Sequence, residues 1–266
     1  MDLELAGKVA VVTGGSHGIG KAIARALSRE GADLALVARN VHDAEATAAE
    51  LGNETGRIVR AYSADTGDDE AVRQAFAQIV NDFGRLDILV NAAAKPGGQA
   101  PPPKLAEITN EDFWSDVNVK VLGYLRCARE AAPHMLKRRW GRIINISGLA
   151  ARSTGSIIGS IRNVGVAALT KNLADELGPG GINVVCVHPG VTRTEKTPGV
   201  IHRRAEAAGV TVDEIERRMA ETNTIRHMVT AEEVADVVAF LASPRSVAIN
   251  GDAIAAGGGM PGAIYY

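Results

Sequence analysis

The sequence of 266 residues has few cysteines, no excess of one charge and no long uncharged apolar run. Its net charge of −2 gives no basic face, which argues against a nucleic-acid partner. The two cysteines, Cys127 and Cys186, form no CxxC pair and no disulfide framework, so we expect buried thiols in a reducing compartment. No run is long enough to span a membrane and no signal-peptide pattern is present. We therefore expect a cytoplasmic protein that needs no metal.

Short apolar runs alternate with longer amphipathic ones along the chain. The predicted strands are residues 9–13, 34–37, 58–62, 86–91, 142–147, 182–187 and, from a weaker pattern, 248–255. The predicted helices are residues 19–29, 43–51, 69–83, 110–138, 164–177 and 231–241. This alternation predicts an α/β fold of Rossmann type: a doubly wound parallel sheet of about seven strands with helices on both faces. Without a linker or internal repeat, residues 1–266 are expected to form a single domain.

Two segments interrupt the rhythm of strands and helices. Residues 95–104 contain Pro96, two glycines and three consecutive prolines, and are expected to form an extended loop. Residues 191–229 form a longer excursion whose middle, 201–219, has helical spacing and many charges. Because it starts at the carboxyl end of a strand, where ligands bind in this architecture, we interpret it as a lid over the substrate. A plain helical insertion at the surface is the alternative.

A glycine-rich turn joins the first predicted strand to the first predicted helix. Gly14, Gly18 and Gly20 have the spacing G-x-x-x-G-x-G. Glycines at this place allow a tight turn and let the backbone approach a pyrophosphate at the helix N-terminus. We predict a pyridine dinucleotide on this turn, with contacts from Gly14, Ser16, His17, Gly18, Ile19 and Gly20.

The end of the second strand distinguishes NADP from NAD. A carboxylate there binds the ribose 2′-hydroxyl, whereas an arginine accommodates a 2′-phosphate. The chain has Arg39 at this place and no acid before Asp43, and Ser16 and His17 are expected to face the same phosphate. NADP is therefore the predicted cofactor. The alternative is that Arg39 is only a solvated charge at the strand end.

Asp65 ends the third predicted strand. Its carboxylate is a candidate to bind the adenine amino group, and equally to cap the helix that begins near Asp69. The two interpretations are compatible.

With these motifs in this order, the chain resembles the short-chain dehydrogenase/reductase family along nearly its whole length. The segments that carry the resemblance are the turn from Thr13 to Gly20, Ala64-Asp65, Asn91-Ala92-Ala93-Ala94, Asn118, Ser147 in Ile144-Asn145-Ile146-Ser147-Gly148, Pro189-Gly190 with Thr192 and Thr194, the stretch 235–243 and Asn250-Gly251. The resemblance implies cofactor contacts from Asp65, Thr66, Asn91, Ala92, Pro189, Gly190, Thr192 and Thr194. It also implies a homotetramer or homodimer.

The family's chemistry implies a reaction on a carbonyl or alcohol substrate. Ser147 would position the carbonyl, and Asn118 would anchor a water that relays protons. In the family a tyrosine protonates the carbonyl oxygen while the cofactor delivers hydride, and a lysine four residues later holds the nicotinamide ribose and lowers the tyrosine pKa.

The chain departs from this pattern at the proton donor, because no Tyr-x-x-x-Lys occurs in it. Counting back along the helix from residues 167–174 puts Gly159 at the tyrosine position and Asn163 at the lysine position. A register slip of one residue would put Ile158 or Ser160 at the acid position instead. Asn163 is expected to keep a ribose hydrogen bond without the charge.

Several groups are candidates to replace the missing acid. Arg162 does not deprotonate near neutral pH but can polarise a carbonyl, and Ser160 can relay a proton through water. His188 titrates near neutrality, and Tyr265 or Tyr266 would have to come from a neighbouring subunit. Three hypotheses follow: an NADP-dependent oxidoreductase with a rearranged acid, a silent nucleotide-binding sensor or assembly protein, and non-redox chemistry on a carbonyl.

Overall fold

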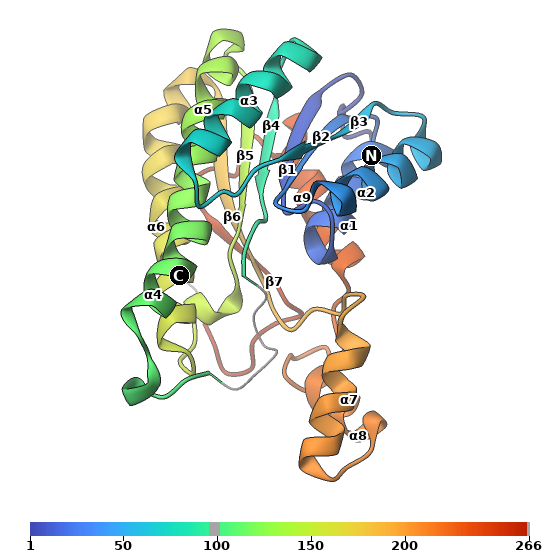
Figure 1. The fold of residues 1–266 in the computed structure, drawn as a ribbon, viewed down its shortest axis with the longest axis vertical. Coiled ribbons are helices and arrows are strands. Elements are labelled where there is room, and N and C mark those ends of the chain that lie inside the picture. Colours follow the sequence, from blue (N-terminus) through green and yellow to red (C-terminus); the bar gives the residue numbers. More distant parts are fainter. Residues whose placement is uncertain (96–101, 265–266) are drawn as a thin grey trace.

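The computed structural model describes residues 1–95 and 102–264 as one domain built around a parallel sheet of seven strands (Figure 1). The strand order is β3-β2-β1-β4-β5-β6-β7, which confirms the Rossmann-type fold predicted from the sequence. The strands are β1 (Val9–Thr13), β2 (Asp33–Ala38), β3 (Val59–Ser63), β4 (Ile88–Asn91), β5 (Gly141–Ile146), β6 (Ile182–Pro189) and β7 (Ala253–Ala256).

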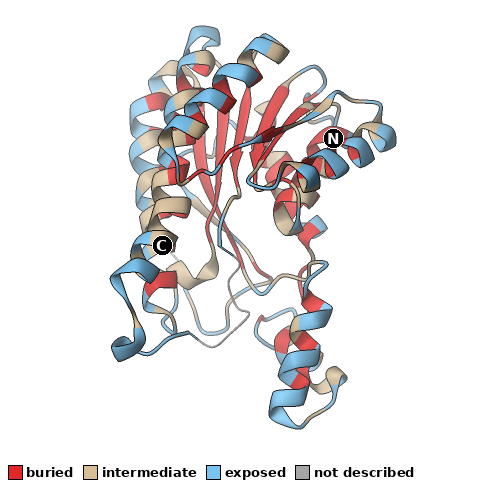
Figure 2. Ribbon diagram, viewed as in Figure 1, coloured by how far each residue is buried: buried red, intermediate tan, exposed pale blue. Residues whose placement is uncertain are grey.

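Helices cover both faces of the sheet, so that its central strands are buried throughout (Figure 2). One face carries α1 (Gly18–Arg29), α2 (Val41–Thr55) and α9 (Ala231–Ala242). The other carries α3 (Asp69–Phe83), α5 (Gly123–Arg138) and α6 (Ile157–Leu177). Short 3₁₀ turns occupy Leu105–Glu107, Leu149–Ala151, Gly178–Gly180 and Pro244–Ser246.

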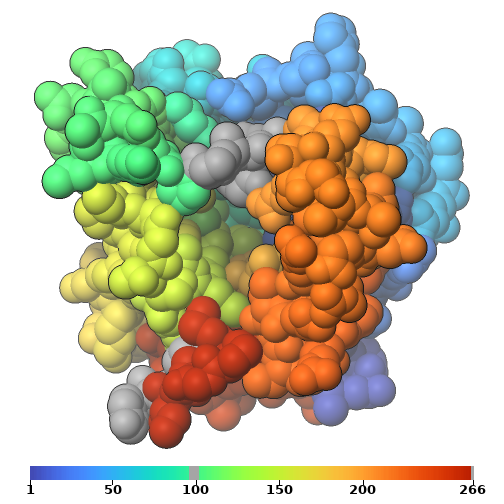
Figure 3. Space-filling view, turned by 90° about the horizontal axis from the view of Figure 1, so that it is seen from below, coloured from blue at the N-terminus to red at the C-terminus, as the bar shows by residue number. Residues whose placement is uncertain are grey.

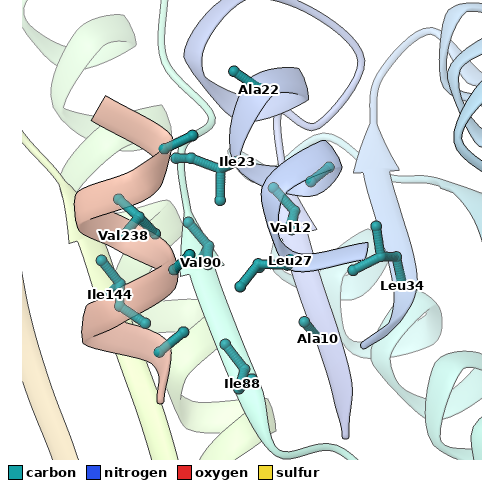
Figure 4. Packing of buried hydrophobic residues seen from close by; sticks show 14 of the residues in the cluster. Ala10, Val12, Ala22, Ile23, Leu27, Leu34, Ile88, Val90, Ile144 and Val238 are labelled. Carbon is teal, nitrogen blue, oxygen red and sulfur yellow. The ribbon is translucent and has the colours of Figure 1, made fainter. Parts of the chain in front are cut away.

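The core on the first face is a close-packed aliphatic layer (Figure 4). Ile23 and Leu27 of α1 and Val238 of α9 point down onto the sheet, where their contacts come from Ala10, Val12, Ile88, Val90 and Ile144. Each fully buried side chain of this size contributes roughly 1.5–3 kcal/mol relative to an exposed one. This layer fixes α1, and with it the glycine turn, against β1 and β4.

Two predicted element starts differ from the structure by five residues or more, in each case because of a local turn or cap. The last strand begins at Ala253 rather than at residue 248, since Gly251 has a φ of 77° and turns the chain just before it. Helix α6 begins at Ile157, two turns before the predicted start at residue 164. The side chain of Ser156 caps it by accepting the N–H of Gly159 at 3.1 Å.

The helix predicted over residues 110–138 is interrupted. The structure divides it into α4 (Asn110–Val117), a π turn (Asn118–Leu122) and α5. In the π turn the N–H of Gly123 bonds to the carbonyl of Asn118, five residues earlier. Such single π turns often occur at functional sites.

The carboxyl edge of the sheet is flanked by the excursion after β6. It contains α7 (Thr197–Ala208) and α8 (Val212–Ala220), which share a small apolar core of their own. Figure 3 shows this edge with α7 and α8 in orange on one side and α4 and the segment before α6 in green to yellow on the other.

Both cysteines are buried and unpaired, as expected. Within the described ranges, none of the helices is long and apolar enough to cross a membrane.

Candidate cofactor and active site

The turn between β1 and α1 depends on its glycines. Gly14 and Gly18 have positive φ angles of 68° and 54°, which other residues rarely adopt. A Cβ atom at Gly20 would lie 2.2 Å from the carbonyl oxygen of Gly14, so a side chain there would push α1 away from the turn. The turn thus brings the positive N-terminus of α1 to the carboxyl edge of the sheet, which suits an anion.

One anion already lies at this helix end. The carboxylate of Glu195 accepts hydrogen bonds from the N–H of Gly18 at 3.0 and 3.2 Å. Thr194 is next to it, since a Cβ at Gly18 would be 3.6 Å from the Thr194 methyl group. The glycine turn and the segment after β6, both predicted to contact the cofactor, therefore meet in space.

Arg39 follows β2 as an exposed residue. Across the ranges 1–95 and 102–264 its guanidinium has no ion-pair or hydrogen-bond partner. The nearest acid along the chain, Asp43, is engaged elsewhere: it accepts the amide of Asn40 at 2.8 Å and lies 3.9 Å from Nε2 of His17. The hydroxyl of Ser16 lies 3.0 Å from the other ring nitrogen of His17. A strand-end arginine with no bound carboxylate suits a phosphate.

Asp65 is part of a tight turn after β3. Its carboxylate accepts the N–H of Gly67 at 2.8 Å. The side chain that caps α3 is Asp68, which accepts two N–H groups of the first helical turn, so the expectation that Asp65 caps this helix is wrong. Thr66 is buried beside it, with its hydroxyl 3.4 Å from the carbonyl of Val119.

Asn91 ends β4 next to Thr13 of β1. Its amide nitrogen donates to Asn145 of β5 at 2.9 Å, but its amide oxygen is buried without a partner. The Thr13 hydroxyl accepts the N–H of Ala92 at 3.1 Å, which directs the chain after β4 across the top of β1.

Ser147 follows β5 and is buried. Its hydroxyl donates to the carbonyl of Asn163 in α6 at 3.0 Å. Asn163 and Gly159 both lie on the buried face of α6. The side-chain oxygen of Asn163 is buried without a hydrogen-bond partner.

Sequence reasoning missed one residue at this site, Lys120. It is 5% exposed, and its ammonium donates to the carbonyl of Ser147 at 2.9 Å. Asn118, the residue singled out from the sequence, donates instead to the carbonyl of Gly67 at 3.0 Å. The spacing in the sequence could have indicated it: Lys120 precedes Tyr124, which is buried, by four residues, and this spacing puts both on one helix face.

The other candidate polar groups are engaged within the protein. Arg162 forms an ion pair with Asp116 of α4 that leaves its Nε buried and unbonded. The hydroxyl of Ser160 donates to the carbonyl of Ser153 at 3.0 Å. Burial lowers the pKa of His188 to about 4, so this imidazole is neutral near pH 7. Tyr265 and Tyr266 lie outside the described residues.

The segment after β6 packs against the end of β7 and leads into α7. Pro189 pairs with Ala256 of β7, and a Cβ at Gly190 would lie 3.1 Å from the backbone of Gly257. The Thr192 hydroxyl donates to the carbonyl of Gly190 at 3.1 Å. The N–H of Thr194 donates to Thr197 at the start of α7.

These features fit an extended dinucleotide. A side chain at Gly14 would fill the space over the turn, because its Cβ atom would lie 2.9 Å from the Ala93 backbone. The side-chain amide oxygens of Asn91 and Asn163 are buried hydrogen-bond acceptors without a donor. The hydroxyl or amide groups of a bound cofactor would supply one. Over the part of the chain that is described, no cluster of His, Cys, Asp and Glu has the geometry of a metal site.

Comparisons with known proteins agree with this architecture. A protein-family model described as enoyl-(acyl carrier protein) reductase matches residues 14–261. The short-chain reductase protein NovJ of Streptomyces niveus is 34% identical over 254 residues, which cover 95% of this chain and 94% of NovJ. The 3-oxoacyl-[acyl-carrier-protein] reductase FabG of Aquifex aeolicus is 31% identical, with 98% of this chain and all of that protein covered.

Solved structures are similar over the same length. L-sorbose reductase from Gluconobacter frateurii, in complex with NADPH and L-sorbose, superimposes with a TM-score of 0.92 at 30% identity and covers 99% of this chain and 100% of its own. An NAD⁺-bound xylitol dehydrogenase superimposes with a TM-score of 0.87 at 27% identity, covering 96% and 100%.

Proposed function

Since the chain belongs to the short-chain dehydrogenase/reductase family, we propose that it is an NADP(H)-dependent oxidoreductase that reduces a carbonyl or oxidises an alcohol with a proton donor other than tyrosine. One observation carries the proposal. The glycine turn, with Arg39 unpaired beside it, lies at the same sheet edge as the buried Ser147. A cofactor site and a polar group for a carbonyl are thus adjacent.

The cofactor would lie across the carboxyl ends of the strands, as in other doubly wound sheets. Its pyrophosphate would replace Glu195 at the N-terminus of α1, and Arg39 would bind the 2′-phosphate. The remaining contacts are proposed for Ser16, His17, Ile19, Asp65, Thr66, Asn91, Ala92, Asn163, Pro189, Gly190, Thr192 and Thr194. NADP is favoured over NAD by Arg39, and similar structures have been solved with each of the two cofactors.

The absence of a tyrosine acid is supported by the two described tyrosines. Tyr124 is fully buried, and its hydroxyl donates to the carbonyl of Ile146 at 2.9 Å. Tyr62 donates to Asp82 at 2.8 Å on the far edge of the sheet. Burial raises the pKa of both phenols, so neither is a ready acid. Gly159, which we place at the family's tyrosine position, has no side chain to offer.

The bound cofactor would supply hydride, and the chain's own residues would do the rest. Ser147 would donate to the substrate carbonyl once its hydroxyl turns from Asn163. The unpartnered oxygen of Asn163 would accept a ribose hydroxyl. Asn118 would act indirectly, because its amide holds the loop at Gly67 on the adenine side of the site.

The excursion over residues 191–229 is proposed to be the lid over the substrate. Its helices α7 and α8 stand beside the carboxyl edge (Figure 3), and Glu195 at its start already touches the glycine turn. The substrate class is carbonyl or alcohol, as for the L-sorbose reductase that superimposes on the chain. A homo-oligomer and a cytoplasmic location stay predictions.

A second candidate function is a nucleotide-binding sensor or assembly protein without turnover. The observation in its favour is that Gly159 and Asn163, which we place at the positions of the family's acid and cation, both lie on the buried face of α6. It shares the cofactor site with the first proposal and differs only in the chemistry.

One experiment separates the two. NADPH and NADH are titrated against the purified protein by nucleotide fluorescence, and ketoses, simple ketones and secondary alcohols are then screened for oxidation or reduction of the nucleotide. The oxidoreductase proposal expects tighter binding of NADPH and turnover of at least one class. Tight NADPH binding with no turnover over the whole panel would contradict it and support the sensor. Failure to bind either nucleotide would contradict both.

A further inference from the structure

Lys120 is an exception in its segment. Among the described residues from 102 to 122 it is the only one whose side chain is buried, although lysine is among the residues least often buried. It lies in the π turn Asn118–Leu122, four residues before the buried Tyr124. The packing of this turn therefore places an ammonium group inside the protein, where the other side chains of the segment remain at least partly exposed.

This ammonium has no carboxylate of its own. Asp116 is the acid nearest in sequence, and it is paired with Arg162 of α6. Within residues 1–95 and 102–264, no acidic oxygen lies within ion-pair distance of Lys120, and its one hydrogen bond goes to the Ser147 carbonyl at 2.9 Å. A buried charge without a counter-charge is costly, and such groups are concentrated at functional sites.

Ser147 connects Lys120 with Asn163. The carbonyl of Ser147 accepts from Lys120, and its hydroxyl donates to the carbonyl of Asn163. Lys120 belongs to the π turn and Asn163 to α6, so the Lys120 side chain and the Asn163 backbone carbonyl meet Ser147 from different helices. The cation that α6 lacks at Asn163 is thus available from the neighbouring helix.

We infer that Lys120 is the proton source of this active site, acting through the hydroxyl of Ser147. This inference rests on the proposed oxidoreductase function. In this scheme the cation absent at Asn163 of α6 is supplied by Lys120 of the π turn. Lys120 is a positioning residue in this scheme, because Ser147 is the group that touches the substrate.

In the proposed reduction, the bound cofactor would supply the hydride for the new C–H bond, and the π electrons of the carbonyl would move to its oxygen. That oxygen takes the hydroxyl proton of Ser147. The Lys120 ammonium turns from the Ser147 carbonyl to its hydroxyl, gives that oxygen a proton and becomes a neutral amine. The positive charge stabilises the developing alkoxide before the transfer, and solvent later reprotonates the amine. Oxidation of an alcohol runs through the same steps in reverse.

The surroundings of Lys120 suit an acid that works near neutrality. Burial, and then the charge of Arg162, lower the pKa of Lys120 to about 7. The other ionisable groups that face it are Asp116 from α4 and Cys186 from β6, which favour the charged form more weakly. Burial raises the pKa of Cys186 to about 11, and that of His188 falls to about 4, so neither titrates near pH 7. A break in activity near pH 7 that disappears in Lys120→Met would therefore report Lys120.

The first test compares Lys120→Met, Lys120→Asn and the exchange variant Lys120→Asn/Asn163→Lys. Lys137→Met, an exposed lysine of α5, is the matched control. The reduction kcat of the wild type is expected to fall as pH rises through about 7. Lys120→Met should lose kcat by roughly 10²-fold and lose this break, while NADPH binding stays within a few-fold. The exchange variant should recover at least about tenfold over Lys120→Asn, because the cation returns from α6.

A merely structural lysine would behave differently. Lys120→Met would then keep both kcat and the break near pH 7, or the exchange variant would stay as inactive as Lys120→Asn while remaining folded by circular dichroism. Either result would overturn the inference.

A second measurement does not need turnover. Lysine labelled with ¹³C at the ε carbon is titrated by NMR, and the Lys120 signal is assigned by its absence in Lys120→Met. A midpoint near 7 that moves when NADP⁺ is added supports the inference, and a midpoint near the ordinary value of 10.5 would overturn it. If the wild type did not bind NADPH, the proposed function would be contradicted instead. Failure of the proposed function and failure of the Lys120 inference are therefore distinguishable.

Discussion

The carboxylate of Glu195 is bonded to the backbone N–H of Gly18, with oxygen–nitrogen distances of 3.0 and 3.2 Å. Gly18 and Glu195 are 177 residues apart in sequence, yet this hydrogen-bonded pair joins the glycine turn to the segment after β6. An acidic side chain occupies the helix end that a pyrophosphate is expected to need. Cofactor binding would have to displace it, which would couple the position of this segment to the nucleotide.

The first prediction concerns this contact. Glu195→Ala should bind NADPH about tenfold more tightly, because the helix end no longer has a competing anion and a charge-assisted hydrogen bond is worth roughly 1.5–3 kcal/mol. Nucleotide titration measures it. Glu232→Ala, which removes an exposed acid from the same groove, is the control and should change affinity little. Equal gains in the two variants would point to net charge rather than to the Gly18 contact.

The second prediction concerns cofactor choice. Arg39→Ala should weaken NADPH binding roughly 10- to 100-fold, because a charged hydrogen bond to the 2′-phosphate is lost, and should leave NADH binding nearly unchanged. Parallel titrations with the two nucleotides provide the internal control. Similar losses for NADPH and NADH would mean that Arg39 supports the fold of the turn and does not recognise the phosphate.

The third prediction concerns the glycine turn. Gly20→Ala puts a Cβ 2.2 Å from the Gly14 carbonyl oxygen, so α1 must shift and both stability and NADPH affinity should fall. Thermal unfolding and nucleotide titration measure these effects. The control is Gly52→Ala within α2, where the nearest atom is 3.6 Å away and a gain of roughly 0.5–1 kcal/mol is expected. A tolerated Gly20→Ala would show that the approach of α1 to β1 is not required for binding.

The fourth prediction concerns stability and pH. Below about pH 7 Lys120 is charged in both the folded and unfolded protein, and the folded state bears the full cost of burying the charge. Between about 7 and 10.5 the unfolded state binds the extra proton, so wild-type stability rises with pH over this window. Lys120→Met should therefore raise the free energy of unfolding by roughly 1–4 kcal/mol near pH 6, and by less near pH 9.5.

Urea denaturation at the two pH values measures this difference. Lys137→Met should show no such pH dependence, since that side chain is exposed. A stability difference independent of pH, or a destabilised Lys120→Met, would show that Lys120 is not a buried charge of lowered pKa.

Much of the fold could be predicted from the sequence because its signals are local. The run Val9–Thr13 is β-branched and buried, and alternation with amphipathic helices implies a parallel sheet. The glycine spacing before α1 was equally readable, since positive φ angles and close backbone approach both require glycine. The boundaries that failed, at Ile157 and Ala253, were decided by a cap and a turn that compete with the apolar pattern.

The sequence by itself determined the sheet, the glycine turn, the place of Arg39 and the lack of a Tyr-x-x-x-Lys pair. Only the tertiary structure decided which helix residue faces Ser147. Asn118 and Lys120 are two residues apart, and which of them points inward depends on a π turn packed against α6 and β6. The same packing decided that Glu195 meets Gly18. Both contacts join segments far apart in the chain, and local residue patterns carry no information about such distances.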